Sequence, residues 1–198
     1  MFSAHRFSEI SRDQSLFTHS GQRKYLNADE RARFAMAARK MEIGSCSFCL
    51  FLLQSGCRIS EALNLTPEGV LFEEGVVLIR SLKKRNQMVV RQVPVPRRLL
   101  ALLNLNTDPE EGHRIWNWQR TWAWMQVKEV MHKSDIMGPH ATPRGLRHGF
   151  GVHAIQSGVP LDMVQRWLGH SDIATTSIYT AAVGPEERAL AERMWQRR

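Results

Sequence analysis

The chain has 198 residues, of which 43 % are hydrophobic and 23 % charged, so it can bury a core and is not a disordered polyelectrolyte. Its length fits one ordinary domain. Lys and Arg number 27 against 19 Asp and Glu, and the net charge of +8 favours a polyanionic partner, above all nucleic acid.

The first half of the chain opens with helical patterns. Residues 1–24 are polar without clear periodicity, and we expect a tail or lead-in there. Asn27 and Glu30 are spaced as a capping box, which starts an alanine-rich helix. Two more helices are expected, an apolar one over 45–54 and a short one from Arg58. Glycines should interrupt the first helix and end the second, at Gly44 and Gly56.

After these helices the sequence pattern changes from one typical of helices to one typical of strands. Residues 75–82 and 88–95 are β-branched runs joined by the basic stretch KKRNQ, a pattern typical of a β-hairpin. A short strand around 69–72 would make three. The longest apolar run, over 48–53, is too short to span a bilayer.

Helical patterns return in the second half of the chain. Thr142 and Pro143 form an N-cap followed by a proline at the first helical position. The other helices are expected from Pro96, over 121–132, from Pro160, around Tyr179, and over 185–197. The expected fold is therefore mainly α with a small three-stranded antiparallel β-sheet.

The cysteines and tryptophans have ordinary interpretations. The three cysteines include one C-x-x-C inside an apolar helix without a second pair, so we expect no metal site and reduced, buried thiols. Four tryptophans lie among basic residues and could stack on bases, but core packing is favoured because duplex DNA seldom offers unstacked bases. They are Trp116, Trp118, Trp122 and Trp124.

Several short segments fit one chemistry, although each alone has an ordinary explanation. An arginine at a helix start is usually a surface residue, and a basic hairpin turn is usually a solvated edge. The segments are GCRISEAL with Arg58, the hairpin with its lysines, RGLRH with Arg147, LGHS with His170, and TTSIYT with Tyr179. Their residue types fit cleavage of a nucleic-acid strand, which needs a nucleophile in line with the phosphodiester and cations beside its negatively charged free oxygens.

Together these motifs resemble the tyrosine recombinases, also called the phage integrase family. The resemblance covers about residues 25–185, and the last two boxes are its most specific part. It implies the recombinase catalytic-domain fold over 25–184, after the lead-in over 1–24. A C-terminal helix over 185–198 would dock on a neighbouring protomer or fold back on its own domain. The short length is similar to that of the fimbrial phase-switch recombinases.

The resemblance also implies a role for each motif residue. Arg58 and Arg147 would clamp the phosphate, because a guanidinium gives permanently charged, bidentate hydrogen bonds. His170 would donate to a non-bridging oxygen, and Tyr179 would attack the phosphorus to give a 3′-phosphotyrosine without metal or cofactor. A hairpin lysine would protonate the leaving oxygen, and the spacing from Arg58 favours Lys83 over Lys84. Further DNA contacts are expected from Lys84, Arg85, Arg91 and His148, the last with packing as its alternative.

One position departs from the family pattern. Arg144 stands where most members of the family have the histidine of a His-x-x-Arg box, and it joins the candidate catalytic residues. His140 lies across Pro143 and cannot replace that histidine. Arginine can donate to a phosphate but is a poor proton acceptor, because its pKa stays above about 12. Cleavage could therefore be slower here.

The expected function is site-specific DNA recombination, for integration, excision, inversion or resolution. Residues 1–24 are too few for the N-terminal clamp domain that most of the family carries, so we expect salt-dependent binding to double-stranded DNA and DNA-bending accessory proteins. The resemblance implies a homotetramer on DNA and a cytoplasmic, nucleoid-associated location without membrane contact. The alternatives are a cleavage-impaired accessory protein and a type IB topoisomerase.

Overall fold

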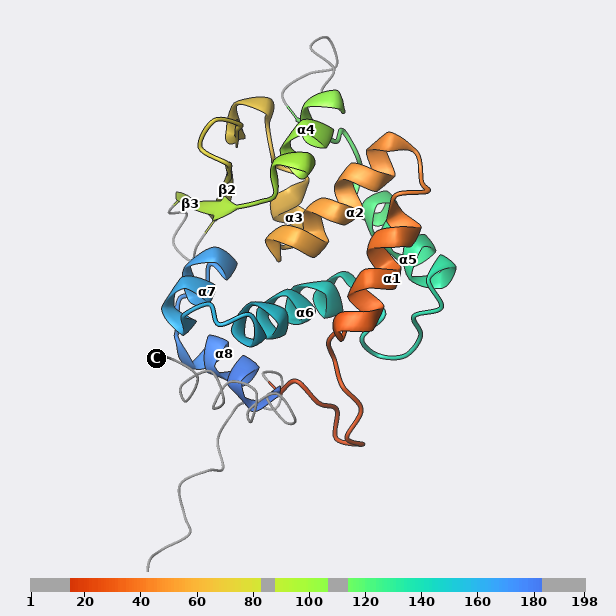
Figure 1. Cartoon of the computed structure of the whole chain (residues 1–198), viewed down its shortest axis with the longest axis vertical. Coiled ribbons are helices and arrows are strands. Elements are labelled where there is room, and N and C mark those ends of the chain that lie inside the picture. Colours follow the sequence, from red (N-terminus) through yellow and green to blue (C-terminus); the bar gives the residue numbers. More distant parts are fainter. Residues whose placement is uncertain (1–14, 83–87, 107–113, 183–198) are drawn as a thin grey trace, which may run out of the picture.

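The computed structural model describes residues 15–82, 88–106 and 114–182, and the predicted fold class is confirmed (Figure 1). Helices dominate, and the strands form one three-stranded antiparallel sheet in the order β1-β2-β3. The α-helices are α1 (Ala28–Ala38), α2 (Ile43–Ser55), α3 (Ile59–Ala62), α4 (Arg97–Leu105), α5 (Arg120–Lys133), α6 (Pro143–Gln156), α7 (Leu161–Leu168) and α8 (Ala174–Ser177). The strands are β1 (Val70–Leu71), β2 (Val76–Leu82) and β3 (Met88–Pro94), and 3₁₀ turns cover Pro67–Gly69 and η2 (Ile178–Ala182).

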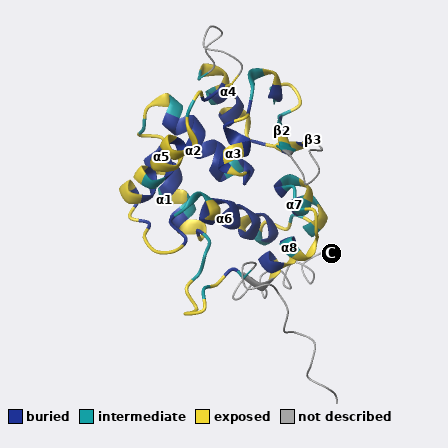
Figure 2. Cartoon of the chain, turned by 180° about the vertical axis from the view of Figure 1, so that it is seen from behind, coloured by how far each residue is buried: buried dark blue, intermediate teal, exposed yellow. Residues whose placement is uncertain are grey.

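Helix α2 forms the centre of the main core, with α1, α4, α5 and α6 around it (Figure 2). It is apolar on all sides, as expected of a fully surrounded helix. The prediction that Gly44 interrupts the first helix is wrong, because the break precedes α2 and Gly44 lies inside it. A side chain there would come within 3.1 Å of the Trp118 ring, which explains the glycine. Gly56 ends α2 in the left-handed conformation, as predicted.

Two helix starts form as the sequence predicts. Asn27 accepts from the backbone of Glu30, and the Glu30 carboxylate accepts from the backbone of Asn27, which completes the capping box of α1. Thr142 Oγ1 accepts from the backbone N–H of Gly145 at the start of α6. This cap fixes the helix that contains both arginines of the R-x-x-R motif.

The sheet has one face on the core and one face exposed. Val77, Ile79 and Val93 are buried against the helices, whereas Arg80 and Gln92 lie on the outer side. The hairpin tip, with Lys83, Lys84 and Arg85, lies outside the described residues, so the structure does not test those predictions.

A second, smaller core joins α6, α7 and η2. It contains Phe150, Val164, Leu168 and Tyr179 together with Leu16, so the described end of the lead-in packs onto the domain. The helix predicted around Tyr179 is present as the short α8 followed by η2, and the tyrosine lies in the 3₁₀ part. The predicted C-terminal helix over 185–198 lies outside the described residues.

The tryptophan prediction is correct for only part of the set. Trp116 is buried and Trp118 packs against the main core, but Trp122 and Trp124 are about half exposed. Ala123 and Val127 form the buried stripe of α5, so their neighbours point outward. The cysteines are buried and free. Among the described helices, none has the length and apolar character needed to cross a bilayer.

Candidate active site

Arg58 and Glu61 form the first part of the site at the start of α3. The backbone N–H of Arg58 donates to Glu61 Oε2 at 2.8 Å, and its guanidinium donates to Oε1 at 2.7 Å. The carboxylate is buried, while about half of the Arg58 side chain is exposed. Glu61 therefore fixes the direction of a cation that faces solvent.

Arg91 holds Glu61 from the other side. This β3 guanidinium is buried, with Nη2 at 2.6 Å from Glu61 Oε2 and a further bond to the hydroxyl of Ser81. Burial alone would raise the pKa of Glu61, but the hydrogen bond and charge of Arg91 help to lower that pKa to about 2. The carboxylate is therefore ionised at neutral pH. Its donors bond inside the protein, so Arg91 is placed to position Glu61, and its expected contact with DNA stays a prediction.

Two arginines donate hydrogen bonds to the C-terminal end of α7. Arg91 Nε donates to the carbonyl of Trp167 at 2.8 Å, and Arg147 Nη2 donates to the carbonyl of Leu168 at 2.8 Å. The last carbonyls of a helix lack partners within the helix and carry its negative dipole end, so cations bind there favourably. Gly169 follows in the left-handed conformation, and His170 comes next. Both arginines thereby fix the turn that presents His170.

Arg147 links this turn to the loop before Arg58. Its Nη1 donates to the carbonyl of Gly56 at 2.8 Å, and the residue is 8 % exposed. Burial, followed by the charge of Arg58, lowers the pKa of Arg147 to about 10, so it stays protonated at neutral pH. Arg58 and Arg147, which are far apart in the sequence and are both predicted phosphate ligands, therefore lie close enough for their charges to interact.

His170 is a neutral imidazole at neutral pH. Burial and the charges of Arg147 and Arg58 lower its pKa to about 3. Its Nδ1 lies 2.8 Å from the hydroxyl of Thr176 on α8. Its ring stacks on that of Tyr179, with centroids 6.2 Å apart.

Tyr179 is 1 % exposed and packs directly on α6. A Cβ on Gly151 would come within 2.6 Å of the tyrosine ring, so this glycine makes room for it. Burial raises the pKa of Tyr179, and the charges of Arg147, Arg144 and Arg58 oppose that increase. The hydroxyl lies 3.2 Å from His148 Nδ1.

Arg144 and His148 complete the group on α6. Arg144 is exposed, and its Nε donates to His148 Nε2 at 3.3 Å. His148 is buried beside the tyrosine, a place that fits the packing alternative better than direct DNA contact. His140 instead pairs with Glu30 at 3.0 Å, away from this group.

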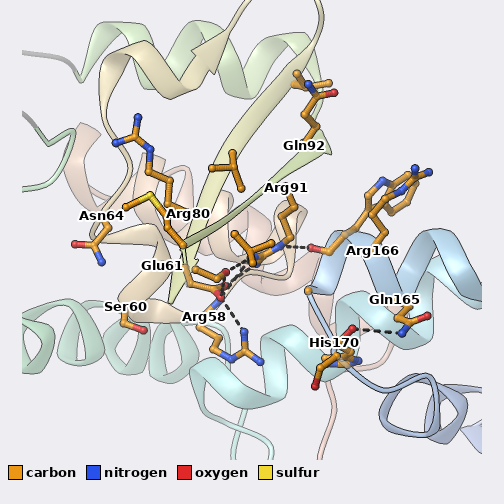
Figure 3. Close-up of a pocket in the computed structure, with 18 of the residues that line it drawn as sticks. Arg58, Ser60, Glu61, Asn64, Arg80, Arg91, Gln92, Gln165, Arg166 and His170 are labelled. Carbon is orange, nitrogen blue, oxygen red and sulfur yellow. Dashed lines mark hydrogen bonds and ion pairs between the residues drawn. The ribbon is translucent and has the colours of Figure 1, made fainter. Parts of the chain in front are cut away.

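An open cleft of about 1720 Å³ borders the site between the sheet, α3 and α7 (Figure 3). Arg58 and His170 lie on its wall, and Arg80, Arg114 and Arg166 add positive charge. Glu61 and Asp162 are the acidic residues of its lining. The cleft therefore suits an anionic partner.

The structure brings together most of the predicted site residues that it describes. Arg58, Arg147, His170 and Tyr179 converge, with Arg144 beside them. Sequence reasoning missed the role of Glu61, although its position three residues after Arg58, at the third position of a short helix, is a capping-box spacing that could have indicated it.

Comparisons with known proteins point to one family. The model of the phage integrase family matches residues 24–184. Tyrosine recombinase XerA of Pyrococcus furiosus is 28 % identical over 86 % of this chain and 61 % of its own length. Tyrosine recombinase XerC of Pseudomonas aeruginosa is 37 % identical over 64 % of this chain and 43 % of its own length. The chain thus spans less than two thirds of these relatives.

Solved structures share the fold. A crystal structure of XerA recombinase aligns with a TM-score of 0.74 and 23 % identity, over 88 % of this chain and 66 % of that one. The catalytic domain of bacteriophage HP1 integrase aligns with a TM-score of 0.63 and 23 % identity, over 85 % of this chain and 93 % of that one. The chain therefore belongs to the phage integrase family of tyrosine recombinases.

Proposed function

We propose that this chain cleaves and rejoins DNA strands at specific sites, with Tyr179 as nucleophile. The observation that supports this most is the convergence on one hydroxyl: the positive charges of Arg147, Arg144 and Arg58 act on Tyr179 while His148 bonds it. Such a cluster stabilises negative charge on the phenol and on a phosphate beside it.

In the proposed reaction the Tyr179 oxygen bonds to phosphorus as the bond from phosphorus to the 5′-oxygen breaks. The phenol proton passes to water, and the 5′-oxygen takes a proton from a hairpin lysine, with Lys83 favoured over Lys84. The product is a 3′-phosphotyrosine and a free 5′-hydroxyl, and reversal by another 5′-hydroxyl rejoins the strand. The charges of Arg58 and Arg147 would stabilise the phosphate oxygens.

His170 would supply a hydrogen bond to the same phosphate. Its neutral ring has one N–H, and a Thr176 hydroxyl that donates to Nδ1 leaves this proton on Nε2. A neutral donor beside two guanidiniums avoids a third positive charge in a partly buried site.

Double-stranded DNA is the proposed partner of the cleft. Its arginines agree with the net charge of +8, and a structurally similar recombinase, XerH, was solved bound to its palindromic difH substrate with a TM-score of 0.71 and 20 % identity. Assembly of a homotetramer on DNA, help from DNA-bending proteins, and action in the cytoplasm at the nucleoid belong to the same proposal.

The test uses nicked duplexes whose cleavage releases a short fragment, so that religation is blocked and the covalent adduct accumulates. Candidate sites come from the genomic neighbourhood, and Tyr179→Phe is the matched control because it removes only the nucleophilic oxygen. The proposal expects an adduct on a denaturing gel that the control lacks. An adduct of equal yield with Tyr179→Phe would overturn it.

Arg144 supports a second candidate, a DNA-binding accessory protein that cleaves poorly. The side chain occupies the first position of the R-x-x-R box and cannot accept a proton at neutral pH. DNA binding without an adduct, in both the natural chain and Arg144→His, would favour this function. Adduct formation by Arg144→His alone would identify Arg144 as the cause of the inactivity.

A further inference from the structure

Arg144, His148 and Tyr179 form a chain of hydrogen bonds whose direction follows from geometry. Arg144 Nε is a permanent donor, and it points at His148 Nε2, 3.3 Å away. That ring nitrogen must accept, so it has no proton. The Tyr179 hydroxyl lies 3.2 Å from the other ring nitrogen, Nδ1.

The proton count of the ring settles the role of Nδ1. A neutral imidazole has one N–H, and a doubly protonated one could not accept from Arg144. With Nε2 as the acceptor, the proton is on Nδ1 and is donated to the Tyr179 oxygen. His148 in this state cannot take the tyrosine proton, but it can stabilise the oxygen that remains once the proton has left.

We propose that Arg144 fixes the tautomer of His148, and that His148 donates a hydrogen bond to the Tyr179 oxygen and stabilises its phenolate for attack. This inference rests on the proposed function and deepens it. His148 then acts on the reacting atom, and Arg144 is a positioning residue that acts through His148. In this arrangement the inability of Arg144 to accept a proton is useful, because it makes Arg144 a permanent donor to His148.

Other groups also act on the tyrosine and have to be separated from this effect. Arg147 from α6 and Arg58 from the start of α3 both favour the phenolate through their charges, and Arg144 does so directly as well. His170, after α7, stacks on the ring and is neutral at neutral pH. The small core beneath the ring is apolar. Any test must therefore distinguish a donated hydrogen bond from a nearby charge.

The test is a titration of Tyr179 in the DNA-free chain. The chain has two tyrosines, so a fluorinated tyrosine of lower pKa gives two ¹⁹F signals, and Tyr25→Phe identifies the second. The matched variants are His148→Asn, which keeps an N–H donor near the Nδ1 position, and His148→Leu, which has similar size and no donor. We expect His148→Leu to raise the pKa of Tyr179 by about one pH unit or more, and His148→Asn to raise it much less.

A double-mutant cycle isolates the effect of Arg144 through His148. Arg144→Met should raise the pKa of Tyr179 more when His148 is present than in His148→Leu, because only the direct charge effect remains in the latter. Arg144 is exposed, so this variant is expected to fold even if His148→Leu does not, and then His148→Asn serves as the second background. Equal shifts from His148→Asn and His148→Leu would overturn the inference, as would an Arg144 effect independent of His148.

These readouts do not need cleavage. Failure of the chain to form any DNA adduct would contradict the proposed function and leave the titration result intact. If the His148 and Arg144 variants left the pKa of Tyr179 unchanged while the natural chain formed the adduct, only the proposed chain of hydrogen bonds would be contradicted.

Discussion

Replacing Arg91 by methionine should destabilise the protein strongly, although Arg91 lies apart from the nucleophile. The change removes one partner of a buried ion pair and leaves the carboxylate of Glu61 with Arg58 and Ser81. Loss of one partner from such a pair costs about 3–5 kcal/mol, and the remaining donors favour the lower end. The pKa of Glu61 gives a second figure, because a decrease from 4.5 to about 2 corresponds to about 3 kcal/mol.

The same pKa sets the pH window of the effect. The folded pKa of Glu61 is depressed, so its stabilisation is present above pH 4.5 and is lost as the pH falls toward 2. Denaturant unfolding should therefore show that Arg91→Met lowers the free energy of unfolding by about 3 kcal/mol at pH 7. This decrease should become smaller near pH 3. Arg80→Met, exposed on the neighbouring strand, is the matched control and should change stability by less than about 0.5 kcal/mol. A loss at pH 7 no larger than that of the control, or one independent of pH, would refute this reasoning.

Three further predictions concern the site and its partner. Gly151→Ala places a methyl group against the Tyr179 ring and should lower the unfolding free energy by about 1–3 kcal/mol and slow adduct formation; unchanged thermal unfolding would contradict the close packing. Thr176→Val removes the hydroxyl that bonds His170, and adduct formation at saturating protein should slow about tenfold with unchanged DNA affinity. The logarithm of the DNA-binding constant should fall linearly with the logarithm of salt concentration, and a salt-independent constant would argue against phosphate contacts in the cleft.

Local sequence rules predicted most of the fold. The capping pair Asn27–Glu30, the Thr142 cap and the left-handed Gly56 depend on neighbours in the chain, and all three occur as predicted. The errors arose where tertiary packing decides. Gly44 lies inside a helix, where the ring of the distant Trp118 leaves no room for a side chain.

The tryptophan error had a signal in the sequence. Residues two apart on a helix point in different directions, and Ala123, Val127 and Val130 already form a helical stripe. Trp122 and Trp124 therefore could not both have shared the buried face. Core packing was favoured because duplex DNA seldom offers unstacked bases, whereas the helical spacing indicated the surface for at least one of the two.

For the candidate site, the sequence indicated the residues but not how they are arranged. Motifs named Arg58, Arg147, His170 and Tyr179, yet no local rule joins Arg91 on a strand to a carbonyl at the end of α7. Such contacts depend on how the sheet packs on the helices, which a single sequence does not reveal. The hydrogen bond between His148 and Tyr179 is of the same kind.

The most direct measurement is identification of the amino acid that bonds to DNA. The adduct from the nicked duplex would be digested with nuclease and trypsin, and the peptide over 167–188 analysed by mass spectrometry, since Tyr179 is its single tyrosine. We predict a nucleotide 3′-phosphate attached at Tyr179. The same mass on another residue, or an adduct that persists in Tyr179→Phe, would contradict the proposed chemistry.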